Sequence, residues 1–204
     1  MAQLQEIWEA KLEPVYPYRK AGPTVEPITG SLTAPAAPKI GVAKPKVIIP
    51  VFPGTNCEYD TAKAFARAGA DPEILVIRNL TPADVTASCE ALVKAIDNSQ
   101  IVMLPGGFSG GDEPDGSAKF IASFFRSPAV TEAVRRLLQQ RDGLMLGICN
   151  GFQALIKLGL VPYGDIRPIT AYDPTLTFNT IGRHQSMLVR TRVASTGSPW
   201  LSHC

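Results

Sequence analysis

A cysteine between two glycines carries the clearest chemical signal in this sequence of 204 residues. Cys149 lies in the run Gly147-Ile148-Cys149-Asn150-Gly151, which follows an apolar stretch and opens a helix-like one. This is the pattern of a nucleophile elbow, with cysteine in place of serine. The sharp strand-to-helix turn of such an elbow holds its nucleophile in a sparsely allowed backbone conformation, and flanking glycines avoid clashes around it. The sequence therefore predicts that Cys149 is a catalytic nucleophile.

The predicted place of this thiol at the start of a helix adds two electrostatic effects. The positive end of the helix dipole favours a thiolate. Backbone N–H groups of the first turn can donate to a developing oxyanion, and we expect the Asn150 N–H to be one such donor. Gln153, one helical turn beyond Cys149, is a candidate for contact with the substrate. The alternative is a buried cysteine with incidental glycines, and the flanking strand and helix argue against it.

A glycine-rich loop follows another apolar run. It reads Pro105-Gly-Gly-Phe-Ser-Gly-Gly-Asp112, and its four glycines allow a ligand to approach the backbone and can expose consecutive N–H groups to an anion. We expect this loop to supply the other half of an oxyanion hole, with the Gly107 N–H as donor and Gly106 and Phe108 beside it. A flexible loop or a phosphate cradle is the alternative, although no Gly-Lys-Ser/Thr follows to make a P-loop.

The other cysteines and a group of acidic residues give weaker signals. Cys57 follows the strand-like run over residues 46–52 and is expected to be a packed small residue at a helix start. Cys89 lies on an apolar helix face and is expected to belong to the core. Asp112, Glu113 and Asp115 lack regular ligand spacing, so we expect a solvated acidic turn there and no metal site.

Alternating strand-like and helix-like stretches must position these residues. Strands are expected over 46–52, 73–77, 100–104 and 144–148, and helices over 59–68, 82–96, 117–125, 128–140 and 150–158. This alternation predicts an α/β fold: an open, mostly parallel, flavodoxin-like sheet with helices on both faces. Ligands in such sheets bind beyond the carboxyl ends of the strands. The cysteine elbow, the glycine-rich loop and Pro53-Gly54 all fall at those ends and can converge.

The first 45 residues differ from the rest. A short helix is expected over residues 3–12, with Ile7, Trp8 and Leu12 as its apolar contacts. Closely spaced prolines then predict an extended, proline-rich arm, because proline fixes φ and removes a hydrogen-bond donor. We therefore expect an N-terminal helix and proline-rich linker over residues 1–45 and the α/β domain over residues 46–204.

Composition narrows the class of protein. The 20 basic and 18 acidic residues are well mixed and give a net charge of +2, so we expect no nucleic-acid partner and no membrane-surface partner. Hydrophobic residues make up 45% of the chain, enough for a sizeable core. No apolar run reaches membrane-spanning length, and the N-terminus lacks the pattern of a signal peptide. Because the cysteines also lack metal-type spacing, we expect free thiols in the cytoplasm.

Together these motifs resemble class I glutamine amidotransferases, and most closely the C-terminal amidotransferase domain of phosphoribosylformylglycinamidine synthases. The resemblance covers about residues 46–200, and its most specific stretches are residues 52–58, 104–109, 147–153 and 179–183. It implies that L-glutamine is the substrate. The Cys149 thiolate would attack the side-chain amide, ammonia would leave, and water would hydrolyse the glutamyl thioester to glutamate.

The resemblance also implies a partner. A synthetase domain of the same enzyme, in the same natural chain, would take the ammonia and convert formylglycinamide ribonucleotide to the amidine in purine biosynthesis. ATP and Mg²⁺ would act in that synthetase domain, and no cofactor is implied in the amidotransferase domain itself.

One departure from the family pattern concerns the catalytic base. The family completes its triad with the His and Glu of a Ser-His-Gly-Glu-Gly type motif, and this chain reaches Cys204 without one. His184 stands where the family has an aromatic residue, and His203 lacks the following Gly-Glu. We therefore expect a C-terminally incomplete domain with little or no glutaminase activity of its own. Another elbow-cysteine hydrolase of the same superfamily and an inactive docking fragment remain the alternatives.

Overall fold

The computed structural model describes residues 2–11, 14, 41–108, 118–176, 179, 181–187, 189, 191–193 and 196–201. The chain divides into two units, one of residues 38–177 and one of residues 1–37 with 178–204. The larger unit holds the sheet and the elbow. Most of the predicted proline-rich arm lies outside the described residues.

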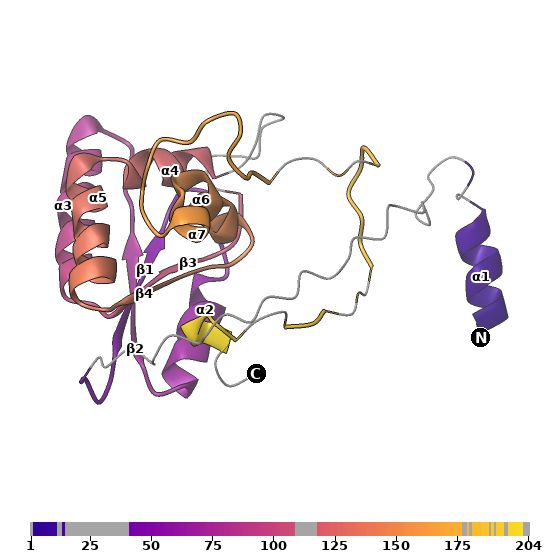
Figure 1. The fold of residues 1–204 in the computed structure, drawn as a ribbon, viewed down its shortest axis with the longest axis horizontal. Coiled ribbons are helices and arrows are strands. Elements are labelled where there is room, and N and C mark those ends of the chain that lie inside the picture. The colour runs from indigo at the N-terminus through magenta and orange to yellow at the C-terminus, as the bar shows by residue number, and fades with distance from the viewer. Residues whose placement is uncertain are drawn as a thin grey trace. The chain divides into compact units, whose positions relative to one another are not determined.

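Four parallel strands form the sheet of the larger unit (Figure 1). They lie in the order β2-β1-β3-β4 and span Lys46–Val51 (β1), Asp71–Val76 (β2), Ile101–Leu104 (β3) and Leu144–Gly147 (β4). Each strand lies within two residues of its predicted range. In the register of β3 with its neighbour β4, Leu104 is the partner of Gly147, so the carboxyl ends of these two strands lie level. The predicted open parallel sheet is confirmed.

The helices of this unit form where the pattern predicted them, except the short α7 (Leu160–Tyr163), which was not predicted. They span Glu58–Arg67 (α2), Pro82–Asp97 (α3), Lys119–Phe125 (α4), Pro128–Arg135 (α5), Asn150–Leu158 (α6) and Leu160–Tyr163 (α7). The predicted helix over residues 128–140 is not uniform, because α5 continues as a π-helical turn over Arg136–Gln140 (η1). Thr81 caps α3, since its hydroxyl accepts a hydrogen bond from the Asp84 N–H at 3.1 Å.

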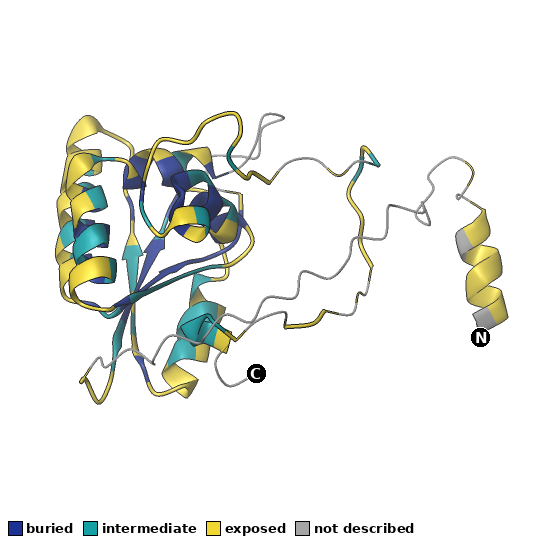
Figure 2. Ribbon diagram, viewed as in Figure 1, coloured by how far each residue is buried: buried dark blue, intermediate teal, exposed yellow. Residues whose placement is uncertain are grey.

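Helices cover both faces of the sheet. Successive side chains of a strand point to opposite faces, and Ile48, Val102 and Leu104 pack in one core cluster with residues of α3, α4, α5 and α6. By contrast, α2 contacts β1 and β2 but contributes nothing to that cluster, which places it on the opposite face. Figure 2 shows the buried residues concentrated on β1 and β3 and on α4 and α6.

An aromatic cluster anchors the carboxyl end of β1. Phe52 is 1% exposed. Its ring meets those of Phe120 and Phe124 edge-on, with centroids 5.7 and 5.5 Å away. Edge-to-face pairs of this kind add to the free energy gained by burying the rings. The chain that leaves β1 towards the site therefore starts from a fixed point in the core.

The smaller unit contains α1 (Ala2–Ala10) and a 3₁₀ turn over Pro199–Leu201 (η2). The predicted N-terminal helix is present. Its predicted apolar contacts are wrong for Ile7 and Trp8, which are 59% and 77% exposed, while Leu12 lies outside the described residues. Among the helices that the structure describes, none combines the length and apolar character needed to cross a bilayer.

Candidate active site

Strand β4 passes into α6 through a sharp turn at Cys149. This residue has φ +54° and ψ −110°, a strained conformation for any residue other than glycine, and it is exposed. Two hydrogen bonds close the turn: the Gly151 N–H donates to the Ile148 carbonyl at 2.9 Å, and the Gln153 N–H donates to the Cys149 carbonyl at 3.0 Å. The backbone therefore has the predicted elbow geometry.

Two glycines let the strand, the turn and the helix pack closely. A Cβ atom at Gly147 would lie 2.6 Å from the carbonyl oxygen of Gly151. A Cβ atom at Gly151 would lie 2.1 Å from the carbonyl oxygen of Leu104 on β3. Because these neighbours are backbone atoms in a close-packed region, no side-chain rotation relieves the contact. Both glycines are therefore needed for steric reasons, as the sequence pattern predicted.

The glycine-rich loop lies beside the cysteine. A Cβ atom at Gly106 would lie 3.3 Å from Cys149 Cβ and 3.9 Å from its sulfur. The Ile148 N–H also donates to the Leu104 carbonyl at 3.1 Å, which continues the pairing of β3 with β4 up to the elbow. Two motifs that are far apart in the sequence thus meet at one edge of the sheet, as expected from the parallel topology.

The turn after β1 joins the same edge. The Asn56 N–H donates to the Gly106 carbonyl at 2.8 Å, and the Phe108 N–H donates to the Gly54 carbonyl at 2.7 Å. Gly107 lies between them with φ +127°, and a Cβ atom there would lie 2.6 Å from the Gly54 oxygen. Over these residues the loop is held as a short antiparallel bridge, so the flexible-loop alternative does not apply to Gly107 and its two neighbours.

The polar side chains at the start of α6 support each other. Asn150 is fully buried, and its side-chain Nδ2 donates to Gln153 Oε1 at 3.2 Å. Gln153 is half-buried. Phe108, at the outer end of the bridge, is 60% exposed. Of the predicted site residues, Gly106, Asn150 and Gln153 therefore lie next to Cys149, and Gly107 and Phe108 continue from Gly106 along the bridge.

The other two described cysteines differ from their predictions to different degrees. Cys57 is exposed, with φ +67°, and its thiol donates to Asn56 Oδ1 at 3.1 Å, so the predicted packed position is wrong. Cys57 is the left-handed residue at which α2 starts, and this backbone conformation directs the Cys57 side chain to solvent. Cys89 packs against the core cluster but is only partly buried, with its sulfur 3.5 Å from Ser127 Oγ.

The predicted acidic turn and His203 lie outside the described residues, and His184 is exposed in the smaller unit. Within the ranges that the structure describes, no cluster of three or more His, Cys, Asp or Glu side chains could hold a metal ion.

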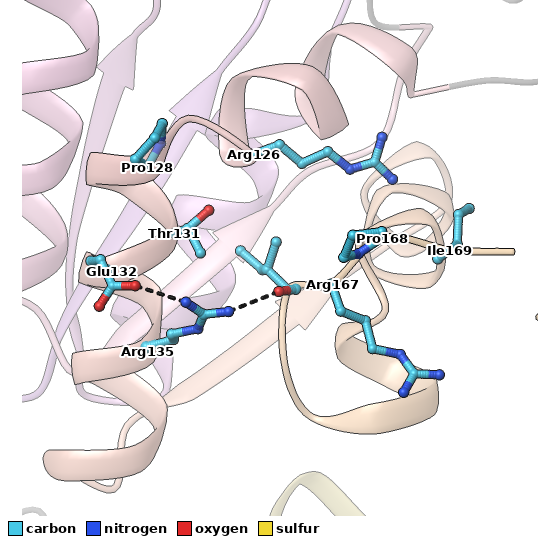
Figure 3. A pocket seen from close by; sticks show the side chains of 9 residues that line it. Arg126, Pro128, Thr131, Glu132, Arg135, Arg167, Pro168 and Ile169 are labelled. Atoms are coloured by element: carbon cyan, nitrogen blue, oxygen red, sulfur yellow. Dashed lines mark hydrogen bonds and ion pairs between the residues drawn. The ribbon is translucent and has the colours of Figure 1, made fainter.

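A separate cavity of about 540 Å³ lies between α5 and the segment that follows α7 (Figure 3). Arg135 crosses this region and binds Glu132 at 2.7 Å and Asp165 at 2.9 Å. The hydrogen bonds from Arg135 hold the pKa of Asp165 below its usual value. None of the described residues of the elbow or of the glycine-rich loop lines this cavity.

Replacing Asp165 with Asn is expected to make stability less sensitive to acid. Because the folded-state pKa of Asp165 is lowered, its carboxylate contributes stability that is present above the unfolded pKa of about 4 and is lost as the pH falls through the folded value. At pH 7 the variant should lose about 1 kcal/mol or less, as half-exposed ion pairs do. As the pH falls below the unfolded pKa of about 4 and through the lower folded value, the difference from wild type should shrink. Urea unfolding of both proteins across this pH range measures the difference in their free energies of unfolding.

The matched control is Glu90→Gln on the exposed side of α3, which removes a carboxylate outside this ion-pair cluster. As the pH falls, the free energy of unfolding of that variant should decrease as it does in the wild-type protein. If the free energy of unfolding of Asp165→Asn also decreased with falling pH as in the wild type, the ion pair between Arg135 and Asp165 would contribute no stability.

Residues 44–203 match the family of CobB/CobQ-like glutamine amidotransferase domains. Curated relatives include three proteins called phosphoribosylformylglycinamidine synthase subunit PurQ. The one from Dehalococcoides mccartyi is 35% identical over 144 residues, covering 71% of this chain and 51% of the relative. The one from Rubrobacter xylanophilus is 35% identical over 159 residues, covering 78% of this chain and 58% of the relative. The one from Cereibacter sphaeroides is 42% identical over 117 residues, covering 57% of this chain and 44% of the relative.

Among solved structures, "Structure of PurLQS from Thermotoga maritima" aligns with a TM-score of 0.39 and 28% identity, covering 57% of this chain and 45% of that chain. The chain spans about half the length of the curated relatives that it matches. The family match extends over most of the sequence and includes the elbow, the glycine-rich loop and the turn after β1. The chain therefore belongs to the family of CobB/CobQ-like glutamine amidotransferase domains.

Proposed function

We propose that this chain belongs to the glutaminase part of a phosphoribosylformylglycinamidine synthase, which hydrolyses L-glutamine through Cys149. The observation that carries this proposal is the exposed, strained cysteine at the start of α6, with Gly106 against its side chain. Membership of the amidotransferase family and the similarity to the three PurQ subunits support the choice of glutamine over other amides.

In the proposed reaction, the Cys149 thiolate attacks the side-chain carbonyl carbon of glutamine. The carbonyl π electrons move to oxygen and form a tetrahedral oxyanion, which the N–H groups of Gly107 and Asn150 stabilise. Each donor of this kind typically contributes about 10²- to 10³-fold to kcat. The C–N bond then breaks, the nitrogen leaves as ammonia after taking up a proton, and a glutamyl thioester remains on Cys149.

Water completes the cycle by attacking the thioester carbonyl. This second addition passes through another oxyanion at the same position, so the same two N–H groups act twice. Collapse of that intermediate releases glutamate and regenerates the Cys149 thiol. Activating the thiol and the water requires a general base near the elbow, and the family resemblance assigns that role to a histidine paired with a glutamate.

The proposed partner is a synthetase domain or subunit that consumes the ammonia. There, ATP and Mg²⁺ would drive conversion of formylglycinamide ribonucleotide to the amidine, and this chain needs no cofactor of its own. The word "subunit" in the names of the three PurQ relatives supports such an assembly.

A glutamine-like affinity label tests the proposal. In the full-length protein, we expect a diazo-ketone analogue of glutamine to alkylate Cys149, as located by peptide mass spectrometry, and an excess of glutamine to protect it. Iodoacetamide, which needs no glutamine site, serves as the control reagent and should also reach the exposed Cys57. Equal labelling of Cys57 and Cys149 by the diazo-ketone would count decisively against a glutamine site at the elbow.

A further inference from the structure

The turn between β1 and α2 is tied to the core through one hydroxyl group. Thr55 Oγ1 donates to the Phe52 carbonyl at 2.7 Å and accepts from the Phe52 N–H at 2.9 Å. The Thr55 N–H donates to the same carbonyl at 2.9 Å. Since the Phe52 ring is enclosed by the aromatic cluster, these three hydrogen bonds fix Thr55 to a residue that cannot shift without disturbing the core.

The same turn orients one peptide bond of the glycine-rich loop. The Gly106 carbonyl accepts from the Asn56 N–H at 2.8 Å. No described peptide bond is cis, and in a planar trans peptide the carbonyl and the N–H point in opposite directions. Because the Gly106 carbonyl points towards the turn, the Gly107 N–H of that peptide points away from it. Among the described residues, the Gly107 N–H donates no backbone hydrogen bond.

That peptide bond lies beside the thiol. A Cβ atom at Gly106 would lie 3.9 Å from the Cys149 sulfur, so the peptide that carries the Gly107 N–H begins next to the thiol on which an oxyanion would form. Rotating the peptide by half a turn would break the bond from Asn56 and exchange the N–H for a carbonyl oxygen. A carbonyl in that place would repel an oxyanion, and the hydrogen bonds of the turn oppose this rotation.

We infer that Thr55 is a positioning residue of the glutaminase site. Its hydroxyl holds the turn after β1, the turn holds the Gly106 carbonyl through Asn56, and the Gly107 N–H is thereby kept in the orientation that an oxyanion donor requires. The inference rests on the proposed function, and it adds to the site a residue that touches neither the thiol nor the substrate.

The test is Thr55→Val, which keeps the side-chain shape and removes both hydroxyl hydrogen bonds. In the full-length protein with its synthetase partner, we expect kcat for glutamine hydrolysis to fall roughly 10- to 100-fold, because small displacements of catalytic groups have effects of this size. KM should change less than about threefold, since the donor acts mainly on the transition state. Thr55→Ser, which retains the hydroxyl, should recover most of the turnover.

Alkylation of Cys149 by iodoacetamide separates positioning from general damage. Attack on an alkyl halide forms no oxyanion, so its rate at Cys149 should be the same in wild type and Thr55→Val. Thr81→Val is the matched control, because it removes another turn hydroxyl, the one that caps α3, and should lower stability without changing kcat.

Wild-type kcat in Thr55→Val would overturn the inference, and so would a parallel fall in the alkylation rate. A wild-type enzyme whose glutamine turnover did not depend on Cys149 would contradict the proposed function itself, and the role of Thr55 would fall with it.

Discussion

Replacement of Cys149 by alanine is expected to lower kcat for glutamine hydrolysis by about 10⁴-fold or more, as removal of other catalytic nucleophiles does. Without the thiol no thioester forms, and only substrate binding and the oxyanion donors remain. The variant should still fold, because the Cys149 side chain is exposed and leaves no cavity when it is shortened. Glutamate release by the full-length protein with its synthetase partner measures the loss, and circular dichroism checks the fold.

Two controls make this result specific. Cys57→Ser changes an exposed thiol at the same edge of the sheet and should keep most of the wild-type turnover. Ammonium salt supplied from solution should restore amidine formation by the Cys149→Ala complex, since the synthetase then receives ammonia without glutamine. Glutamate release above a tenth of the wild-type rate in Cys149→Ala would show that another group is the nucleophile.

The parts of the site that could be predicted from sequence are those with local physical causes. The elbow requires small residues on both sides of Cys149, and each of these glycines meets a backbone atom where a Cβ would lie. The cap of α3 likewise depends on Thr81 and the next three residues alone. Apolar strands joined by helices determined the parallel sheet, and the sheet in turn determined which loops meet at its edge.

The remaining features depend on contacts between distant segments. Asn56 meets Gly106 only because β1 and β3 are neighbours in a particular register, and no local pattern specifies that register. The exposure of Cys57 follows from its left-handed conformation, which amino-acid type does not reveal for a cysteine. The π-helical turn after α5 gave no signal either, because its residues suit an ordinary α-helix. In each case tertiary packing selects among locally acceptable conformations.

Gly151→Ala is expected to destabilise the larger unit by about 3 kcal/mol or more, at the upper end for overpacked positions. The added Cβ would lie 2.1 Å from the carbonyl oxygen of Leu104, so α6 must move away from β3 or the strand must bend. Urea unfolding followed by circular dichroism measures the change. If the variant does not fold, Gly147→Ala, whose Cβ would meet the Gly151 carbonyl at 2.6 Å, supplies a second and milder test of the same packing.

The sign of this effect is informative because helix propensity predicts the opposite. In an exposed helix interior, replacing glycine with alanine typically stabilises by about 1 kcal/mol, and Gly151 is the second residue of α6. Gly164→Ala is the matched control: it has open space around it and φ +73°, so it should cost only about 1–2 kcal/mol for the left-handed backbone. A Gly151→Ala protein as stable as wild type would mean that α6 does not pack against β3 at this distance, and the elbow that presents Cys149 would lose its steric basis.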